Sequence, residues 1–222
     1  MTTASIEHCP PGQPPDPDAL KPGDFTLHRA TTTKGKGGAT TTLGKLIQAG
    51  ERTRFGNSDF ARWTHSTIVL TEDGDIAEAI EKGVLIRNLE KYKDSDYVVV
   101  HVTAGDEQRA HAVAFARIIA ERHAKYGVLN FIGLAVQSLF GWTISVHMDN
   151  QFICSGLVAR ATEKYIDAYD RSPENMMPGD LAHYWKAQSG EPLPKLGFFG
   201  RFLDRLVTFF GLFRNRKPKP PE

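Results

Sequence analysis

Cysteine is scarce in this sequence. The chain has 222 residues but only two cysteines, Cys9 and Cys154. Two cysteines so far apart exclude a disulfide-dense scaffold, and they lack the short spacing of the ligand pairs in a structural zinc site. We therefore expect Cys154 to be a free thiol without a disulfide partner.

Excess charge and long apolar runs are also missing. The formal net charge is only +1, which argues against a dedicated nucleic-acid-binding protein. No run of about 18 apolar residues occurs, so we expect no membrane-spanning helix. Residues 1–22 have neither the basic region nor the apolar region of a secretory signal peptide. We therefore expect a cytoplasmic protein, and export by a route that needs no cleaved signal stays open.

The two ends of the chain differ in composition from its middle. Residues 1–20 are rich in proline, threonine and aspartate, which predicts a flexible leader. Over 197–213 phenylalanine and leucine recur at helical spacing, with arginines on the opposite side. We therefore assign 191–222 to an amphipathic aromatic helix followed by a basic, proline-rich tail. This helix either covers part of the domain or a dimer surface, or lies in a membrane interface.

The pattern between these ends predicts one α+β domain over 21–190, which the chain length allows. Its core is an antiparallel sheet, a meander or half-barrel packed against helices. Helices are expected over 106–125 and from Cys154 to about Tyr169. Strands are expected over 25–28, 63–70, 76–80, 83–87 and 97–102, the second and third joined by a hairpin turn.

Three later segments are less regular. Residues 128–148 are apolar but are interrupted by glycines, and we assign no element there. Residues 177–181 contain proline, glycine and aspartate, which predicts a turn. Residues 182–186 are expected to form a short final element.

Cys154 carries the chemistry of this sequence, because it lies where an apolar run turns into a predicted helix. Unpaired backbone N–H groups at a helix start favour the thiolate over the thiol. A thiol nucleophile needs a base, and the base needs an orienting group. His65 precedes the hairpin turn and Glu78 follows it, so the two can be neighbours on one sheet face. A carboxylate on one imidazole nitrogen would leave the other nitrogen to face Cys154.

Short motifs follow in a particular order along the chain. His65 comes first, Glu78 lies in a hydrophobic-Ala-Glu-Ala strand, and Cys154 follows in Phe-Ile-Cys-Ser. This order resembles the circularly permuted papain-like cysteine hydrolases, the YiiX-like relatives of the NlpC peptidase group and distant relatives of lecithin:retinol acyltransferase. The resemblance covers roughly residues 20–187. Further matches are Pro22-Gly23-Asp24-Phe25, Gly83-Val84, Lys125-Tyr126 and Pro178-Gly179-Asp180-Leu181.

The resemblance implies a role for each of the three residues. Cys154 would be the nucleophile, His65 the general base and acid, and Glu78 the orienting carboxylate. The implied activity is a thiol hydrolase, a peptidase or amidase or else an acyltransferase, that cleaves a peptide, isopeptide or lipid-ester bond without a cofactor. The chain departs from the family in the longer apolar segment 128–148, and in having Ser-Thr after His65 where Val/Trp-Gly is common.

Several other residues have alternative interpretations. Tyr126 and Ser155 are candidates for the oxyanion site or the pocket, although packing at a helix end is slightly favoured for Tyr126. The backbone N–H of Cys154 is the better oxyanion donor. A zinc site of His65 and Cys154 with a further histidine, His101 or His147, is disfavoured because no short ligand pair exists. The remaining histidines are expected to be exposed: His8, His28, His111, His123 and His183.

A different class of function stays open beside catalysis. The same fold could serve as a non-catalytic binding module, with its pocket reused and its C-terminal segment binding a membrane or a partner. No nucleic-acid partner is expected.

Overall fold

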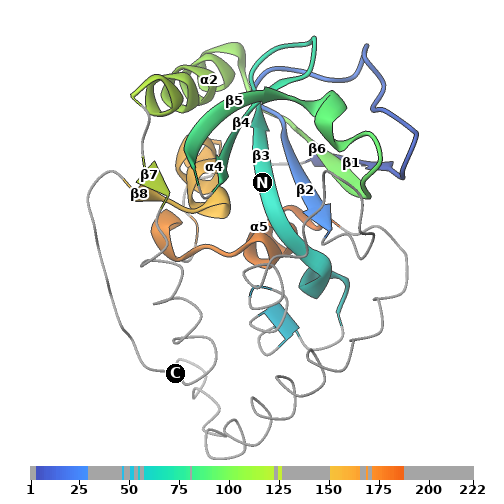
Figure 1. Cartoon of the computed structure of the whole chain (residues 1–222). Helices are drawn as coiled ribbons and strands as arrows, with labels where there is room; N and C mark the ends of the chain where they lie inside the picture. Colours follow the sequence, from blue (N-terminus) through green and yellow to red (C-terminus); the bar gives the residue numbers. More distant parts are fainter. Residues whose placement is uncertain are drawn as a thin grey trace, which may run out of the picture.

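A six-stranded sheet forms the core of the part of the chain that the structure describes (Figure 1). The computed structural model describes residues 4–29, 47, 51–52, 55, 58–80, 82–122, 125–126, 151–165, 169 and 172–187. All strand pairs in this sheet are antiparallel, in the order β1-β6-β2-β3-β4-β5. The strands are β1 (Ala4–Cys9), β2 (Phe25–Arg29), β3 (Trp63–Val69), β4 (Asp75–Ile80), β5 (Gly83–Asn88) and β6 (Tyr97–Val102).

Helices and short elements surround this sheet. Three α-helices have both bounds within the described residues: α2 (Asp106–Glu121), α4 (Cys154–Thr162) and α5 (Pro178–Trp185). The predicted α+β class with an antiparallel sheet is therefore confirmed. The other elements are the 3₁₀ helices η1 (Asp59–Arg62), η2 (Leu89–Tyr92) and η3 (Pro173–Asn175) and a two-stranded parallel pair, β7 (Lys125–Tyr126) with β8 (Gln151–Phe152).

The central strands of the sheet are buried on both faces. Side chains alternate between the faces of a strand, so Val98 and Val100 of β6 belong to one apolar cluster and Val99 to another. The first cluster also contains buried residues of α2, α4 and α5, which cover that face. The second cluster lies on the opposite face, and Leu20 of the N-terminal segment packs into it with Cys9, Val69, Ile76, Leu89, Tyr92 and Tyr97.

The N-terminal segment differs from the expected flexible leader. Ala4 to Cys9 form β1, which pairs with β6 from Ala4 opposite Val102 to Cys9 opposite Tyr97. The expectation of a flexible leader over 1–20 is therefore corrected for these residues. The proline-rich composition of 1–20 gives no sign of this strand, because β1 is stabilised by pairing with β6, about 90 residues later in the chain.

Two helices are shorter than predicted. Helix α2 ends at Glu121 rather than near residue 125, and Lys125–Tyr126 pairs instead with Gln151–Phe152. This pairing places the backbone after α2 beside the residues that precede Cys154. Helix α4 ends at Thr162, well before Tyr169, and the Tyr165 N–H closes a turn on the Thr162 carbonyl at 2.9 Å.

Helix α5 begins where a turn was predicted. Pro178 is the first residue of α5, a position that needs no backbone N–H donor. The Asp180 carboxylate accepts a hydrogen bond from the Met177 N–H at 2.9 Å. The prediction of a turn over 177–181 is therefore wrong: proline, glycine and aspartate here form the first turn of a helix.

Some predictions lie outside the described residues, namely those for 128–148 and for 191–222 with its proposed helix 197–213. In the part of the chain that the structure describes, none of the helices combines the length and the apolar character that crossing a bilayer requires.

Candidate active site

Cys154 is the first residue of helix α4, as predicted. Ile153 precedes it in an extended conformation, and the Ile153 carbonyl accepts the first helical hydrogen bond from the Leu157 N–H at 2.9 Å. N–H groups in the first turn of a helix lack intrahelical acceptors and carry partial positive charge. The Cys154 side chain therefore lies where a negative charge is favoured, although only 4% of the residue is exposed.

His65 and Glu78 meet on one face of the sheet. In the β3–β4 pair Ile68 lies opposite Ala77, and the same register places Glu78 opposite Thr67. His65 is two residues from Thr67, so it shares this face and is a diagonal neighbour of Glu78. Its Nε2 lies 3.1 Å from Glu78 Oε2. The prediction that these residues are neighbours across the hairpin is confirmed.

Cys154 reaches this face where the pairing between β3 and β4 ends. The Val69 N–H donates to the Asp24 carbonyl at 2.8 Å, so the main-chain N–H and carbonyl of Val69 point toward β2. These groups alternate in direction along an antiparallel strand, so those of Ser66 point toward β4. The β3–β4 ladder does not extend to Ser66. The Ser66 N–H is instead hydrogen-bonded to Cys154, as is the Ser155 N–H. The Cys154 thiol thus takes the place of the main-chain acceptor that β4 would offer to Ser66 if the ladder continued.

The electrostatic environment favours a thiolate–imidazolium pair. Burial alone would raise the pKa of Cys154, but the positive charge of His65 and hydrogen bonds from His65, Ser66 and Ser155 hold this pKa below its ordinary value. Burial alone would lower the pKa of His65. The negative charge of Cys154 and hydrogen bonds to Cys154 and Glu78 outweigh that effect and raise the pKa of His65 to about 9.

Glu78 is fully buried, and both of its oxygens are engaged. Oε2 accepts from His65 and from the Tyr92 hydroxyl, while Oε1 lies 2.6 Å from Lys91 Nζ and 3.9 Å from Arg87 Nε. Burial alone would raise the pKa of Glu78, but hydrogen bonds from His65, Lys91 and Tyr92 and the charge of His65 bring it well below its ordinary value. Glu78 is therefore an ionised carboxylate that holds the imidazole.

Sequence reasoning missed Lys91 and Tyr92, the two residues of η2 that hold Glu78. They follow Glu78 by more than ten residues, beyond β5, and no motif links them to it. The only sequence signal is local: Leu89 and Tyr92 are apolar or aromatic residues in an otherwise charged stretch, as expected of side chains that point inward.

His28 is a third residue whose place was missed. It was expected to be exposed, but it is buried and lies directly across the β2–β3 pair from His65. Its ring centroid is 4.0 Å from that of Tyr92, and its Nε2 is 2.6 Å from Thr26 Oγ1. Burial and the positive charge of His65 lower the pKa of His28 well below its ordinary value. A neutral imidazole thus packs beside the charged one, because both faces of this central strand are covered.

The two further candidates occupy different positions. The Ser155 hydroxyl donates to the Met176 carbonyl at 2.7 Å, so its proton is used to hold α4 against the segment after η3. Only the main-chain N–H of Ser155 serves the thiol. Tyr126 lies on β7, where its backbone is opposite that of Phe152, two residues before Cys154.

The histidines offered as extra zinc ligands are not brought to this site. His101 lies between Asp24 and Glu7, with a carboxylate oxygen of each residue 2.9 Å from a ring nitrogen. His147 is outside the described residues. Among the residues that the structure describes, no group of three or more histidine, cysteine or acidic side chains is arranged to hold a metal ion.

The site therefore joins a buried thiol, an imidazole and an ionised carboxylate from α4, β3 and β4. Nε2 of His65 is committed to Glu78, which leaves Nδ1 as the nitrogen available to Cys154. Such a chain of contacts can generate a nucleophile and can move one proton to or from a bound substrate. Comparison with known proteins finds no matching family model, no matching curated protein and no matching solved structure.

Proposed function

We propose that this chain is a thiol hydrolase of the permuted papain-like, YiiX-like kind, which cleaves an amide, isopeptide or ester bond through an acyl-enzyme. The observation that carries the proposal is the position of His65, hydrogen-bonded to Cys154 on one side and 3.1 Å from Glu78 Oε2 on the other. A buried cysteine without a function has no need of a charged imidazole held by a buried carboxylate.

In the first half-reaction, the Cys154 thiolate attacks the substrate carbonyl carbon, and a C–S bond forms while the carbonyl electrons move to oxygen. The tetrahedral intermediate then collapses, and the scissile C–N or C–O bond breaks. The imidazolium of His65 gives its proton to the leaving nitrogen or oxygen. The products are a thioester on Cys154 and a neutral His65.

In the second half-reaction, neutral His65 takes a proton from water as the water oxygen attacks the thioester carbonyl. Collapse of this second intermediate breaks the C–S bond, releases the carboxylic acid and restores the Cys154 thiolate beside imidazolium. In an acyltransferase, an alcohol or amine acceptor would replace water. Glu78 keeps its negative charge throughout, as the orienting carboxylate of a triad does.

The negative charge that develops on the carbonyl oxygen needs a donor. We assign that role to the main-chain N–H of Cys154, which is at the first position of α4 and has no intrahelical acceptor. The Ser155 hydroxyl is a weaker candidate, because its proton is already donated to Met176.

The substrates that suit this chemistry are peptides, isopeptides and lipid esters, and the reaction requires no cofactor. Peripheral contact with a membrane through 197–213 is part of the proposal, since it would hold the protein near an amphiphilic substrate. We propose a cytoplasmic site of action.

Trapping of the acyl-enzyme tests this function. Intact-protein mass spectrometry after addition of activated peptide and lipid esters should detect one acyl group, mapped to Cys154. The Cys9→Ser variant serves as the matched control and should acylate normally, because Cys9 is buried on the edge strand β1, which β6 and β2 separate from β3. Absence of acylation with every ester, or acylation that persists in Cys154→Ala, would contradict the proposal.

A second candidate is a non-catalytic binding module on the same fold. One observation favours it: only 4% of Cys154 is exposed, whereas a nucleophile must meet a substrate carbonyl. Full biological function of Cys154→Ser would support the module and reject catalysis. Vesicle co-sedimentation with and without 197–222 tests the membrane contact, which is rejected if truncation leaves binding unchanged.

A further inference from the structure

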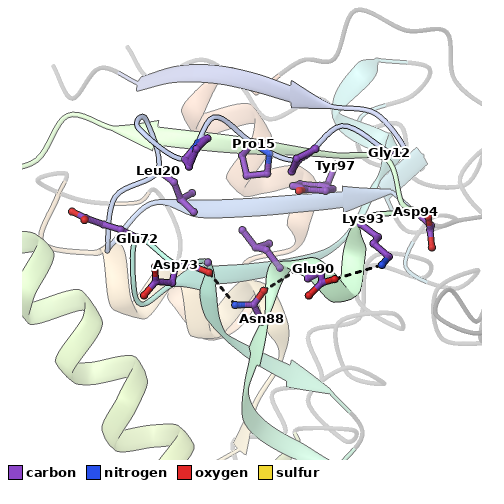
Figure 2. A pocket seen from close by; sticks show the side chains of 14 residues that line it. Gly12, Pro15, Leu20, Glu72, Asp73, Asn88, Glu90, Lys93, Asp94 and Tyr97 are labelled. Carbon is purple, nitrogen blue, oxygen red and sulfur yellow. Dashed lines mark hydrogen bonds and ion pairs between the residues drawn. The ribbon is translucent and has the colours of Figure 1, made fainter.

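A cavity of about 470 Å³ lies against the sheet face that carries Tyr97, the face on which Leu89 of η2 packs. The proline-rich segment 10–20 forms one wall, and the β3–β4 turn and the β5–η2–β6 connection form the other. Figure 2 shows Leu20, Pro15 and Tyr97 in a row, with Glu72 and Asp73 near one end and Lys93 and Asp94 near the other. The volume is within the range of about 300–1,000 Å³ typical of ligand pockets.

The lining of this pocket combines apolar walls with a negative rim. Its walls include three prolines, two leucines and a tyrosine: Pro14, Pro15, Pro17, Leu20, Leu89 and Tyr97. Among the described residues that line it, the acidic side chains are Glu72, Asp73, Glu90 and Asp94 and the only basic one is Lys93. Its Nζ is already 3.5 Å from a carboxylate oxygen of Glu90. The rim therefore carries more negative charge than its own lysine can neutralise.

A ligand that fits this lining has several positive charges and a stiff, partly apolar backbone. Proline-rich segments adopt an extended, preformed helix that docks in aromatic-lined grooves at a low entropic cost. Basic side chains on such a segment would lie along the acidic rim, where the attraction is modest for each pair and weakens with salt.

The chain itself contains such a segment at its C-terminal end. Residues 214–222 read Arg-Asn-Arg-Lys-Pro-Lys-Pro-Pro-Glu, with four basic residues, three prolines and one acidic residue. We propose that this pocket is a binding site for residues 214–222 of the same chain. The proposal is independent of catalysis by Cys154.

The length of the intervening chain permits this occupancy. The described residues end at Ala187, whose carbonyl accepts a hydrogen bond from Trp63 Nε1 at 3.2 Å. Fully extended, the chain between Ala187 and Arg214 can span up to about 90 Å. A folded domain of this size is about 40 Å across. Because this reach exceeds the diameter of the domain, residues 214–222 can reach the pocket from Ala187.

Binding of a labelled peptide tests the proposal. A fluorescein-labelled peptide with the sequence of 214–222 is titrated into the full chain and into a chain truncated after residue 213, and anisotropy is followed. The truncated chain should bind the peptide. The full chain should bind it at least about tenfold more weakly, because a tethered segment competes at an effective concentration on the order of millimolar.

Charge variants identify the pocket. In the truncated chain, Glu72→Gln with Asp94→Asn should weaken peptide binding by about fivefold or more, and added salt should weaken it further. The matched control is Glu107→Gln with Glu121→Gln, two exposed carboxylates of α2 away from the pocket, which should leave binding unchanged. A peptide with its four basic residues replaced by glutamine should not bind.

Three results would overturn the proposal. The first is equal peptide affinity of the full and truncated chains. The second is unchanged affinity in the Glu72 and Asp94 double variant. The third is a concentration-dependent dimer formed by the full chain but not by the truncated chain, since the segment would then occupy the pocket of a second copy.

Discussion

His65 Nε2 lies 3.1 Å from Glu78 Oε2, although the two residues are not directly opposite each other in the sheet. The β3–β4 register places Thr67 across from Glu78, and the contact is diagonal. This geometry has a chemical consequence. Nε2 of His65 is held by the buried Glu78 carboxylate. The other ring nitrogen is then directed to the Cys154 thiol, which lies where the β3–β4 pairing ends.

Replacement of Glu78 by glutamine removes the charge that supports imidazolium. The pKa of His65 should then fall from about 9. Activity that needs imidazolium is lost as pH rises through this pKa, so the alkaline limb of the kcat/KM profile should move to lower pH in Glu78→Gln. Loss of the orienting carboxylate should also lower kcat by roughly 10²-fold or more.

The matched control for Glu78→Gln is Arg87→Gln. The Arg87 side chain is 44% exposed and its Nε is 3.9 Å from Glu78 Oε1, so its removal should change the profile little. An alkaline limb that stays in place in Glu78→Gln would show that Glu78 does not support the charge of His65.

Tyr92→Phe removes one donor from Glu78 without changing the packing of the ring. We expect unfolding to become easier by about 1.5–3 kcal/mol, as for a hydrogen bond to a charged group, and kcat to fall severalfold with KM unchanged. Tyr97→Phe is the matched control, because the Tyr97 hydroxyl is hydrogen-bonded to Cys9 rather than to Glu78. Denaturant unfolding and steady-state kinetics measure both effects. Equal kinetic losses in the two variants would refute a positioning role for Tyr92.

Local patterns were sufficient to predict much of this fold and site. Alternating apolar residues predicted the strands from Phe25 to Val102, and the hairpin between β3 and β4 placed His65 near Glu78. The start of α4 at Cys154 followed from the change from an apolar run to a helical pattern. These features depend on neighbours in sequence or on a single tight turn, which is why one sequence reveals them.

Features that depend on distant partners could not be predicted in this way. Strand β1 exists because β6 accepts it, and Lys91 and Tyr92 reach Glu78 only after β5 has turned back. His28 is buried because both sheet faces are covered, a property of the whole domain. Composition misled in a different way at Pro178, where residues typical of a turn begin a helix.

Two glycines with positive φ provide a matched pair for stability. Gly12 has φ +83° and open space where a Cβ would lie, whereas Gly23 has φ +88° and a Cβ there would meet the Tyr165 hydroxyl and lie 3.3 Å from Arg109 Cα. Alanine at either position has the same backbone strain. The difference in stability between the two variants therefore measures the packing of the added methyl group. Gly23→Ala should be less stable than Gly12→Ala by about 1–3 kcal/mol in urea unfolding. Equal losses would contradict the close approach of Tyr165.

His101 should make stability depend on pH. Hydrogen bonds to Asp24, and then to Glu7, outweigh burial and raise the pKa of His101. The stabilisation from imidazolium is therefore complete below the unfolded pKa of about 6.5 and is lost as pH rises through the raised folded pKa. His101→Gln should lower the unfolding free energy by about 1.5–3 kcal/mol at low pH, and by less at high pH. A loss that is the same at both pH values would contradict this linkage.

The most direct test of the central claim is the rate at which iodoacetamide alkylates Cys154 near neutral pH. Cys9 is the internal control, because burial and the charge of Glu7 raise its pKa to about 12. We predict rapid labelling of Cys154, negligible labelling of folded Cys9, and strong suppression of Cys154 labelling in His65→Ala. Equal labelling of Cys154 in the wild-type and His65→Ala proteins would contradict the thiolate–imidazolium pair.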